Sequence, residues 1–476
     1  MKRVRLDYTN VIRKSEYHKT LFSLEEIGAI RADIEQAHRE LKEERLTKDE
    51  LSFLALPYAY HQAYTHTPKN VFADTLWEDK EKIEQKAGLI RRNCSDYVQI
   101  AIGGSALGAI ALTSALGHGL DPCEQQSCYK IHMPDNVDPE WIDRILRSIQ
   151  VEKSFFAVIS NSGQTVETLA NFFIFYNALK TKVAAEQLKE RVVVMTNPAS
   201  GALAGLCKGE GFTLIRIPAS VCGRFSVLSP AGLFTAAVSG VVIDELLEGA
   251  RVMDELTDEL AFWDNPMLIY ASIHYLANVQ KNIDTLVLMP YSQGLRTIAD
   301  WYSQLVAESL GKDGKGITPV KALGATDQHS QLQLYNQGPK NKLVTFFCVD
   351  KHRRFVEIPS EFASCEDFRY LWGHSLNQLL DSEQKATAIS LFNNGVPNCS
   401  LRIPKVSSFY LGQLLILLEK VVCVLGKLYK VNAFNQPGVE ESKEYARAML
   451  GKKGGIYEKK RSELAFYSDP DELRVI

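Results

Sequence analysis

The chain has 476 residues, of which 46% are hydrophobic and 23% are charged. This balance is typical of globular proteins, so it excludes a largely disordered chain and provides apolar material for more than one core. Lysine and arginine number 54 against 57 aspartates and glutamates, which gives a net charge of −3. The chain therefore lacks the long-range positive field that draws proteins to nucleic acid or anionic lipid, although this balance is compatible with a local phosphate pocket.

Nine cysteines are scattered through the chain, and no two of them form a CxxC pair. An odd, dispersed set predicts neither a disulfide framework nor a zinc ribbon, and it is typical of the reducing cytoplasm. The basic N-terminus is not followed by the apolar stretch of a signal peptide. We therefore expect a cytoplasmic protein.

Residues 1–74 are expected to form a helical extension. Ile27, Ile30, Ile34 and Leu41 recur at helical spacing, which places one apolar stripe against a core. No catalytic pattern occurs in this segment.

A first α/β unit is expected over residues 75–245. Short apolar or β-rich runs alternate there with helix-like segments, which is typical of βαβ units around a parallel sheet. These runs are Val98–Ile102, Phe155–Ile159, Val192–Met195 and Leu214–Ile217.

Two segments of this unit, Tyr97–Leu120 and Phe225–Ile243, contain no Asp, Glu, Lys or Arg. About 20 apolar residues can span a bilayer, so a membrane helix has to be weighed for each. Glycines and serines interrupt both segments, and the second also contains a proline. They are better interpreted as strand, turn and helix buried between packed layers.

A second α/β unit is expected over residues 260–430, after an acidic helical connection at Glu245–Glu259. Its predicted strands and helices are Thr285–Met289, Leu295–Leu310, Leu343–Val349 and Leu411–Tyr429. Residues 431–476 are expected to form a C-terminal helix and tail. The predicted fold class is thus α/β, with two similar parallel-sheet units and helical extensions at both ends.

The strongest local pattern is SNSGQT at Ser160–Thr165, which places three hydroxyls around a glycine between a predicted strand and helix. Backbone N–H groups at a helix N-terminus carry partial positive charge, and hydroxyls beside them can complete a phosphate cradle. The same residues also serve as ordinary helix caps. From this segment alone the two interpretations are equally good.

A second turn, at Gly103, Gly104 and Ser105, follows the first predicted strand. It does not fit GxGxxG, and Leu107 stands where a nucleophile elbow needs glycine. No Walker A sequence occurs. These mismatches weaken the dehydrogenase, hydrolase and P-loop interpretations.

Further along the chain, Arg224 follows a glycine at a turn, where a guanidinium can approach an oxyanion closely. Gln304 and Glu308 share one face of a predicted helix, at the border of its buried stripe. Burial would raise the pKa of such a glutamate toward that of a useful general base. Taken singly, a surface arginine and a solvated glutamate are the commoner cases.

Two more candidates lie nearer the C-terminus. His329 sits in a polar, loop-like stretch, and none of the ten histidines has metal-ligand spacing. Lys443 follows Pro437, which suits the start of a helix. In isolation the first is a structural histidine and the second an exposed helix lysine.

Together these pieces form an ordered set across residues 97–445: IGGSALG, SNSGQT, GRFS, QLVAESLGK, GATDQHSQL and FNQPGVEESK. In this order the chain resembles the glucose-6-phosphate isomerase (phosphoglucose isomerase) family. GRFS and the last motif are specific to that family, whereas SxSGxT marks the wider sugar isomerase (SIS) fold. The resemblance implies two flavodoxin-like SIS domains, aldose–ketose isomerisation of glucose 6-phosphate and fructose 6-phosphate, and no metal or redox cofactor.

The resemblance also implies roles for residues at the matching positions. Glu308 would move the proton between C2 and C1, and Arg224 would stabilise the enediolate. His329 and Lys443 would assist ring opening and the hydroxyl proton movements. A homodimer is implied, with His329 supplied across the interface. The implied substrate-binding residues are Gly104, Ser105, Ser160, Asn161, Ser162, Gly163, Thr165, Gln304 and Gln436.

Three positions depart from the family pattern. Asn161 stands where many relatives have lysine, Cys222 replaces a usual glycine, and Gly324–Asp327 differs from the usual approach to the histidine. Two alternatives stay open. One is an SIS isomerase acting on mannose 6-phosphate or an amino sugar phosphate. The other is a noncatalytic sugar-phosphate sensor, which would need Ser160–Thr165 but not Glu308, Arg224, His329 and Lys443 together.

Overall fold

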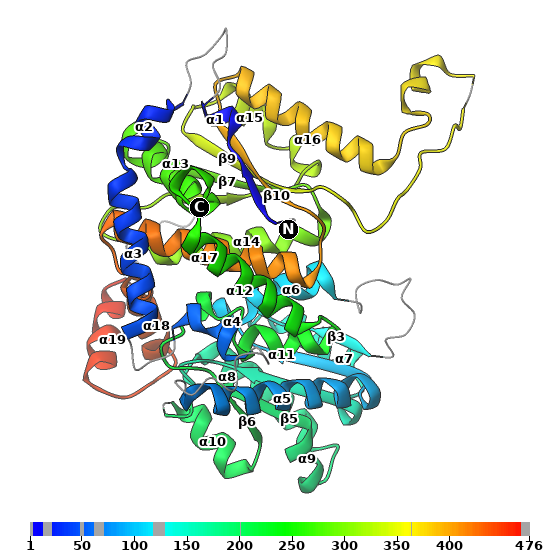
Figure 1. The fold of residues 1–476 in the computed structure, drawn as a ribbon. Helices are drawn as coiled ribbons and strands as arrows, with labels where there is room; N and C mark the ends of the chain where they lie inside the picture. The colour runs from blue at the N-terminus through cyan, green and yellow to red at the C-terminus, as the bar shows by residue number, and fades with distance from the viewer. Residues whose placement is uncertain are drawn as a thin grey trace.

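The computed structural model describes residues 3–12, 21–47, 52–60, 71–117, 129–199, 201–362 and 364–467. Two five-stranded sheets lie toward opposite ends of the molecule, and helices cover their faces and fill the space between them (Figure 1). Cys123 and Cys128 lie outside the described residues. The seven cysteines within them are free thiols.

The first sheet has the strand order β3-β2-β4-β5-β6, with all strands parallel. This is the flavodoxin-like order 2-1-3-4-5. Its strands are β2 (Asp96–Ile100), β3 (Lys130–His132), β4 (Ser154–Ile159), β5 (Val192–Thr196) and β6 (Thr213–Arg216). The helices of this unit are α6 (Gly104–Leu116), α7 (Pro139–Ser148), α8 (Val166–Lys180), α9 (Ala185–Arg191), α10 (Ala202–Glu210) and α11 (Pro230–Val238).

The second sheet has the order β1-β10-β9-β7-β8. Its four parallel strands are β7 (Thr285–Pro290), β8 (Thr318–Lys321), β9 (Lys342–Val349) and β10 (Asn398–Ile403). The helices of this unit are α13 (Pro266–Lys281), α14 (Arg296–Leu310), α15 (Leu332–Gln337), α16 (Leu376–Asn393) and α17 (Ser408–Tyr429). The two sheets confirm the predicted α/β class with flavodoxin-like parallel sheets flanked by helices.

The N-terminal segment differs in one respect from the predicted all-helical extension. The short strand β1 (Arg5–Asp7) pairs antiparallel with β10, so the first residues complete the second sheet. Helices follow it, namely α1 (Thr9–Ile12), α2 (Leu24–Ala29), α3 (Arg31–Thr47), α4 (Leu56–Ala59) and α5 (Val71–Asn93). The predicted stripe is buried, because Ile27 and Ile34 are fully enclosed and Leu41 is 2% exposed.

Helices α12 (Ile243–Glu259) and α17 run side by side through the middle of the molecule (Figure 1). A Cβ atom on Gly412 would lie 1.9 Å from the Leu246 carbonyl oxygen, so glycine is what lets the two helix backbones touch. By length and composition α17 could cross a membrane, but 89% of its apolar window is buried inside the protein. It serves here as a core helix.

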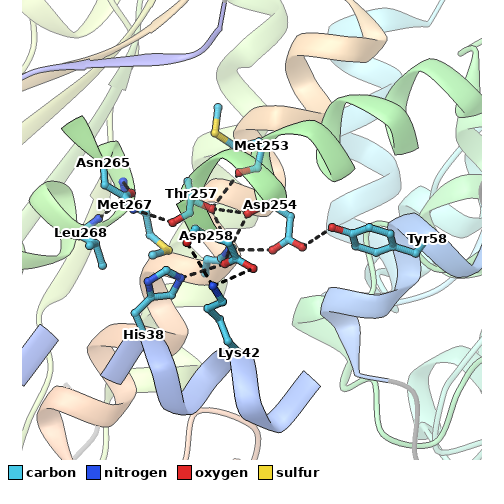
Figure 2. A network of polar contacts seen from close by, with 11 residues as sticks. His38, Lys42, Tyr58, Met253, Asp254, Thr257, Asp258, Asn265, Met267 and Leu268 are labelled. Carbon is cyan, nitrogen blue, oxygen red and sulfur yellow. Dashed lines mark hydrogen bonds and ion pairs between the residues drawn. The ribbon is translucent and has the colours of Figure 1, made fainter. Parts of the chain in front are cut away.

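A buried ionic network holds the same pair of helices together. The Nζ of Lys420 on α17, 1% exposed, lies 2.8 Å from carboxylate oxygens of both Asp254 and Asp258 on α12. Figure 2 shows these carboxylates between Tyr58 of α4 and His38 of α3, which contact Asp254 at 2.8 Å and Asp258 at 3.0 Å. The network therefore ties the N-terminal helices to the core.

Two features complete the fold. Residues 350–362 and 364–375, between β9 and α16, extend away from the body as an arm that contains a short 3₁₀ helix, η9 (Glu366–Leu371) (Figure 1). The C-terminal part forms α18 (Glu440–Met449) and α19 (Gly455–Tyr467), which pack on each other.

Candidate active site

The SNSGQT segment forms the turn between β4 and α8. Gly163 adopts φ +61°, a left-handed conformation that favours glycine. The Thr165 hydroxyl does not cap the helix; it meets the Ser160 hydroxyl at 2.9 Å. Ser160 is buried, whereas Ser162 is exposed. The turn thus presents a hydroxyl and helix N–H groups at the carboxyl edge of the sheet, which favours a ligand cradle over a capping cluster.

Asn161, the residue that departs from the family pattern, points out of this cradle. Its Nδ2 donates a hydrogen bond of 2.6 Å to the Val221 carbonyl oxygen. It therefore fastens the cradle to the chain segment that leads into Arg224. Cys222 adopts φ −70° and ψ 156°, which any residue can adopt, so its replacement of glycine does not strain the turn.

Arg224 lies in the 3₁₀ turn η5 (Gly223–Phe225) and is only 2% exposed. Its Nε donates to Ser309 Oγ at 2.7 Å, and one terminal nitrogen donates to Gln436 Oε1 at 3.0 Å. The other terminal nitrogen donates to the carbonyl oxygens of Ala433 and Asn435. The guanidinium is thereby held in one orientation by two segments of the chain, the end of α14 and residues 433–436.

Glu308 lies in the last turn of α14, where one of its oxygens is 3.5 Å from the Arg224 guanidinium. Gln304, one helical turn earlier, donates to the other oxygen at 2.9 Å. The Glu308 side chain keeps 24% of its surface exposed. A partly accessible carboxylate thus faces a buried, fixed cation.

The turn after β2, at Gly103 and Gly104, packs against Gln304 and Arg224. A Cβ atom on Gly103 would lie 3.4 Å from Gln304 Nε2, and one on Gly104 would lie 2.4 Å from the Arg224 amide nitrogen. Ser105 follows in the first turn of α6. Because no side chain separates the backbones, the turn after β2 lies directly against Gln304 and Arg224.

Two residues that the sequence analysis did not single out support this site. Ser309 accepts the hydrogen bond from Arg224 Nε. Lys312 Nζ donates to the carbonyl oxygens of Glu308, Ser309 and Asn432, at 3.0, 2.6 and 2.7 Å. Lys312 thereby joins the C-terminal end of α14 to the segment that holds Arg224. Both residues lie inside the motif QLVAESLGK, so their position beside Glu308 was the available signal.

Burial alters two titratable groups at this place. It raises the pKa of the Cys222 thiol, so this cysteine stays protonated near neutral pH. It also lowers the pKa of the Lys312 ammonium, with the nearby Arg224 charge acting in the same direction. A protonated thiol cannot act as a base beside Glu308.

Two of the predicted catalytic residues form no hydrogen bond or ion pair with this group within the described residues. His329 follows a 3₁₀ turn fixed by Asp327, whose Oδ2 accepts the Leu323 amide hydrogen at 2.7 Å, and its side chain is exposed. Lys443 pairs with Glu440 on its own helix at 2.9 Å. Among the described residues, no hydrogen bond or ion pair joins either side chain to Glu308 or Arg224.

The assembled geometry suits proton transfer beside a developing negative charge. A carboxylate that can take and return a proton faces a guanidinium whose position is fixed before any ligand arrives. Asn161 connects this pair to a cradle suited to a phosphate group. A ligand that carries a phosphate at one end and an acidic carbon at the other would match both parts.

The comparisons with known proteins agree with this geometry. The family model for phosphoglucose isomerase matches residues 69–459. A glucose-6-phosphate isomerase of Carboxydothermus hydrogenoformans is 40% identical over 432 residues, covering 88% of this chain and 89% of the relative. A glucose-6-phosphate isomerase of Rubrobacter xylanophilus is 40% identical over 362 residues, covering 76% of this chain and 83% of the relative.

Solved structures show the same fold. A hypothetical protein from Thermus thermophilus matches with a TM-score of 0.80 and 33% identity, covering 94% of this chain and all of the neighbour. A glucose-6-phosphate isomerase from Chlamydia trachomatis matches with a TM-score of 0.77 and 22% identity, covering 97% of this chain and 91% of the neighbour. The family match over most of the chain and the 40% identity to its members show that the chain belongs to the phosphoglucose isomerase family.

Proposed function

We propose that the chain catalyses the reversible isomerisation of glucose 6-phosphate and fructose 6-phosphate through an enediolate. The observation that carries the proposal is the Glu308 carboxylate, partly accessible and 3.5 Å from the buried Arg224 guanidinium. Aldose–ketose isomerisation moves one proton between adjacent carbons and transfers no electrons out of the substrate. It therefore needs a base, a fixed cation and no redox cofactor.

In this mechanism Glu308 removes the proton from C2 of the open-chain aldose and returns it to C1. Gln304 orients the carboxylate through its hydrogen bond of 2.9 Å, which leaves the oxygen nearer Arg224 to face the substrate. The pair of electrons released at C2 forms the C1–C2 double bond, and the π electrons of the C1 carbonyl move onto its oxygen, which becomes anionic. As Glu308 returns the proton to C1, the hydroxyl proton at O2 is transferred to O1 with the help of His329 and Lys443, and C2 becomes the carbonyl carbon. The same steps in reverse convert the ketose to the aldose.

Arg224 stabilises the enediolate because its charge is already in place when the oxyanion forms. Four of its five N–H groups donate to Ser309, Gln436 and two backbone carbonyls, so little reorganisation accompanies the reaction. The Oε1 atom of Gln436 accepts a hydrogen bond from Arg224, so the amide N–H groups of Gln436 remain for substrate hydroxyls.

The phosphate group is held by the SNSGQT turn, with Ser162, Thr165 and the backbone around Gly163 as donors. Ser160 is buried, and it orients Thr165 by the hydrogen bond of 2.9 Å. Asn161 contributes by fixing the cradle relative to Arg224. Gly104 and Ser105 line the sugar between these two parts.

Ring opening requires an acid and a base distinct from Glu308, and we assign it to His329 and Lys443. Because neither side chain contacts Glu308 or Arg224 within the described part of one chain, we propose a homodimer in which His329 enters the partner's site. Large apolar side chains exposed on the arm support such an interface. Phe355, Phe362 and Tyr370 are 73, 75 and 74% exposed. We place this enzyme in the cytoplasm.

A coupled assay that follows glucose 6-phosphate formation from fructose 6-phosphate tests the activity directly, with mannose 6-phosphate as the comparison substrate. We expect turnover of fructose 6-phosphate to glucose 6-phosphate to dominate. Exclusive formation of mannose 6-phosphate would favour the alternative SIS isomerase. Binding of sugar phosphate without turnover would favour the noncatalytic sensor.

Mixing two inactive variants tests the shared site. If Glu308→Gln and His329→Ala chains are refolded together, half of the dimers are mixed, and each mixed dimer has one site free of both changes. About a quarter of the unaltered activity should therefore return. If each site is built within one chain, the mixture stays at the sum of the two variants.

A further inference from the structure

Each of the two sheets has one point at which the order of its parallel strands reverses. In the first sheet the strand order reverses between β2 and β4, and in the second it reverses between β7 and β9. Ligands of open α/β sheets bind at the carboxyl ends of the strands at this reversal. In the first sheet that position holds the Gly104 turn and the SNSGQT turn, to which we assigned substrate binding.

The corresponding position of the second sheet is a crevice of about 280 Å³. Ser292 and Gly294 line it from the connection after β7, and His352, Arg353 and Arg354 line it from the connection after β9. The first turn of α16 closes it with Asn377. A crevice of this size is near the lower limit of small-ligand pockets, ~300 Å³, and suits a compact group.

The charge of this crevice is one-sided. Two arginines and a histidine line it, and within the described part of the chain no acidic side chain is among its lining residues. Burial lowers the pKa of His352, so the two arginines supply the positive charge at neutral pH. The N-terminus of α16, an 18-residue helix, adds the favourable end of its dipole. This combination recognises a phosphate group or a similar oxyanion.

The crevice is separate from the catalytic site but mechanically connected to it. Ala115 at the C-terminal end of α6 lines the crevice, and Arg353 donates to its carbonyl oxygen at 2.9 Å. The other end of α6 begins at Gly104 in the catalytic site. Thirteen helical residues span about 20 Å, so one ligand cannot occupy both places.

We propose that this crevice is a second binding site, which takes the phosphate group of a small phosphorylated metabolite. The comparison of the two sheets relies on the proposed phosphate cradle, whereas the crevice, its arginines and its helix end stand independently of it. The second sheet thus retains a phosphate site where the first sheet binds substrate.

Equilibrium dialysis of the full chain with radiolabelled inorganic phosphate counts the sites. We expect two per chain in the unaltered protein and one in the Ser162→Ala/Thr165→Ala variant. Arg353→Gln with Arg354→Gln should weaken the remaining site by tenfold or more, because both charged donors are lost. Arg144→Gln with Arg147→Gln, an exposed pair on α7, removes the same charge elsewhere and should change nothing.

Arg353 also contacts Ala115, so Arg354→Gln alone and a thermal melt of each variant distinguish lost binding from lost folding. Phosphate binding unaffected by either arginine variant would overturn the proposal, as would a single site that disappears with Ser162 and Thr165. If the arginine variants remove one site while the Ser162/Thr165 change removes none, the crevice is a phosphate site and the proposed phosphate cradle is wrong.

Discussion

Replacement of Gly104 by alanine tests whether the close contact between the two turns holds the catalytic groups in place. The added methyl group would lie 2.4 Å from both the Arg224 amide nitrogen and the Gly223 carbonyl carbon. Carbon atoms in van der Waals contact lie about 3.5 Å apart, so the two backbones have to separate by roughly 1 Å. Neither contact is with a side chain that could rotate away.

A displacement of ~1 Å in a catalytic group can cost about 10²-fold in rate, and overpacking costs roughly 1–3 kcal/mol of stability. We therefore expect kcat for fructose 6-phosphate to fall about 10²-fold, with a measurable loss in urea-induced unfolding. Gly205→Ala on α10 is the matched control, because nothing lies within 4 Å of its Cβ position. It should keep full activity and gain up to about 1 kcal/mol in stability. A Gly104→Ala enzyme with more than half of the unaltered kcat would refute this reasoning.

Three further predictions concern single groups. Ser162→Ala and Thr165→Ala should each weaken sugar-phosphate binding by about 1.5–3 kcal/mol, measured by calorimetry, and leave binding of a nonphosphorylated analogue unaffected. Equal losses of affinity for both ligands would mean that the turn only shapes the site. Arg224→Lys keeps the charge but loses the planar fork, so kcat should fall ~10²–10³-fold. A five-carbon hydroxamate that mimics the enediolate should lose more affinity for this variant than substrate does. Equal losses of affinity would show that Arg224 binds substrate and transition state equally well. Lys420→Met removes the ammonium group that two buried carboxylates share at 2.8 Å, so unfolding free energy should fall by about 3–5 kcal/mol, against 1 kcal/mol or less for Lys385→Met at an exposed pair; a small loss at Lys420 would show that the buried network adds little.

Regular α/β elements were predictable because their patterns are local. The runs at Phe155–Ile159 and Val192–Met195 are confirmed as β4 and β5, and both are buried along their whole length. β10 was missed because it begins Asn-Cys-Ser, although the Asn398 amide is satisfied by the Ala388 and Val396 carbonyls. β1 was missed because a strand of three residues is too short to show a hydrophobic period, and its extended conformation depends on pairing with β10.

Prediction of the site from sequence was limited in the same way, because local motifs do not show long-range contacts. The motifs located Glu308, Gln304 and Arg224, which the structure brings together. They did not reveal that Asn161 would bind the Val221 carbonyl rather than face a ligand, because that contact joins residues 60 positions apart. The sequence likewise could not place His329 and Lys443 relative to Glu308, since no local pattern records a long-range contact.

The most direct test of the proposed mechanism is solvent exchange of the substrate C2 proton in Glu308→Gln. The amide keeps the size of the carboxylate and can still accept a hydrogen bond from Gln304, but it cannot take a proton at neutral pH. We predict a fall in kcat of at least ~10², little change in KM and loss of exchange. Glu255→Gln, at a partly buried ion pair on α12, is the control and should exchange normally. Exchange retained by Glu308→Gln would show that another group is the base.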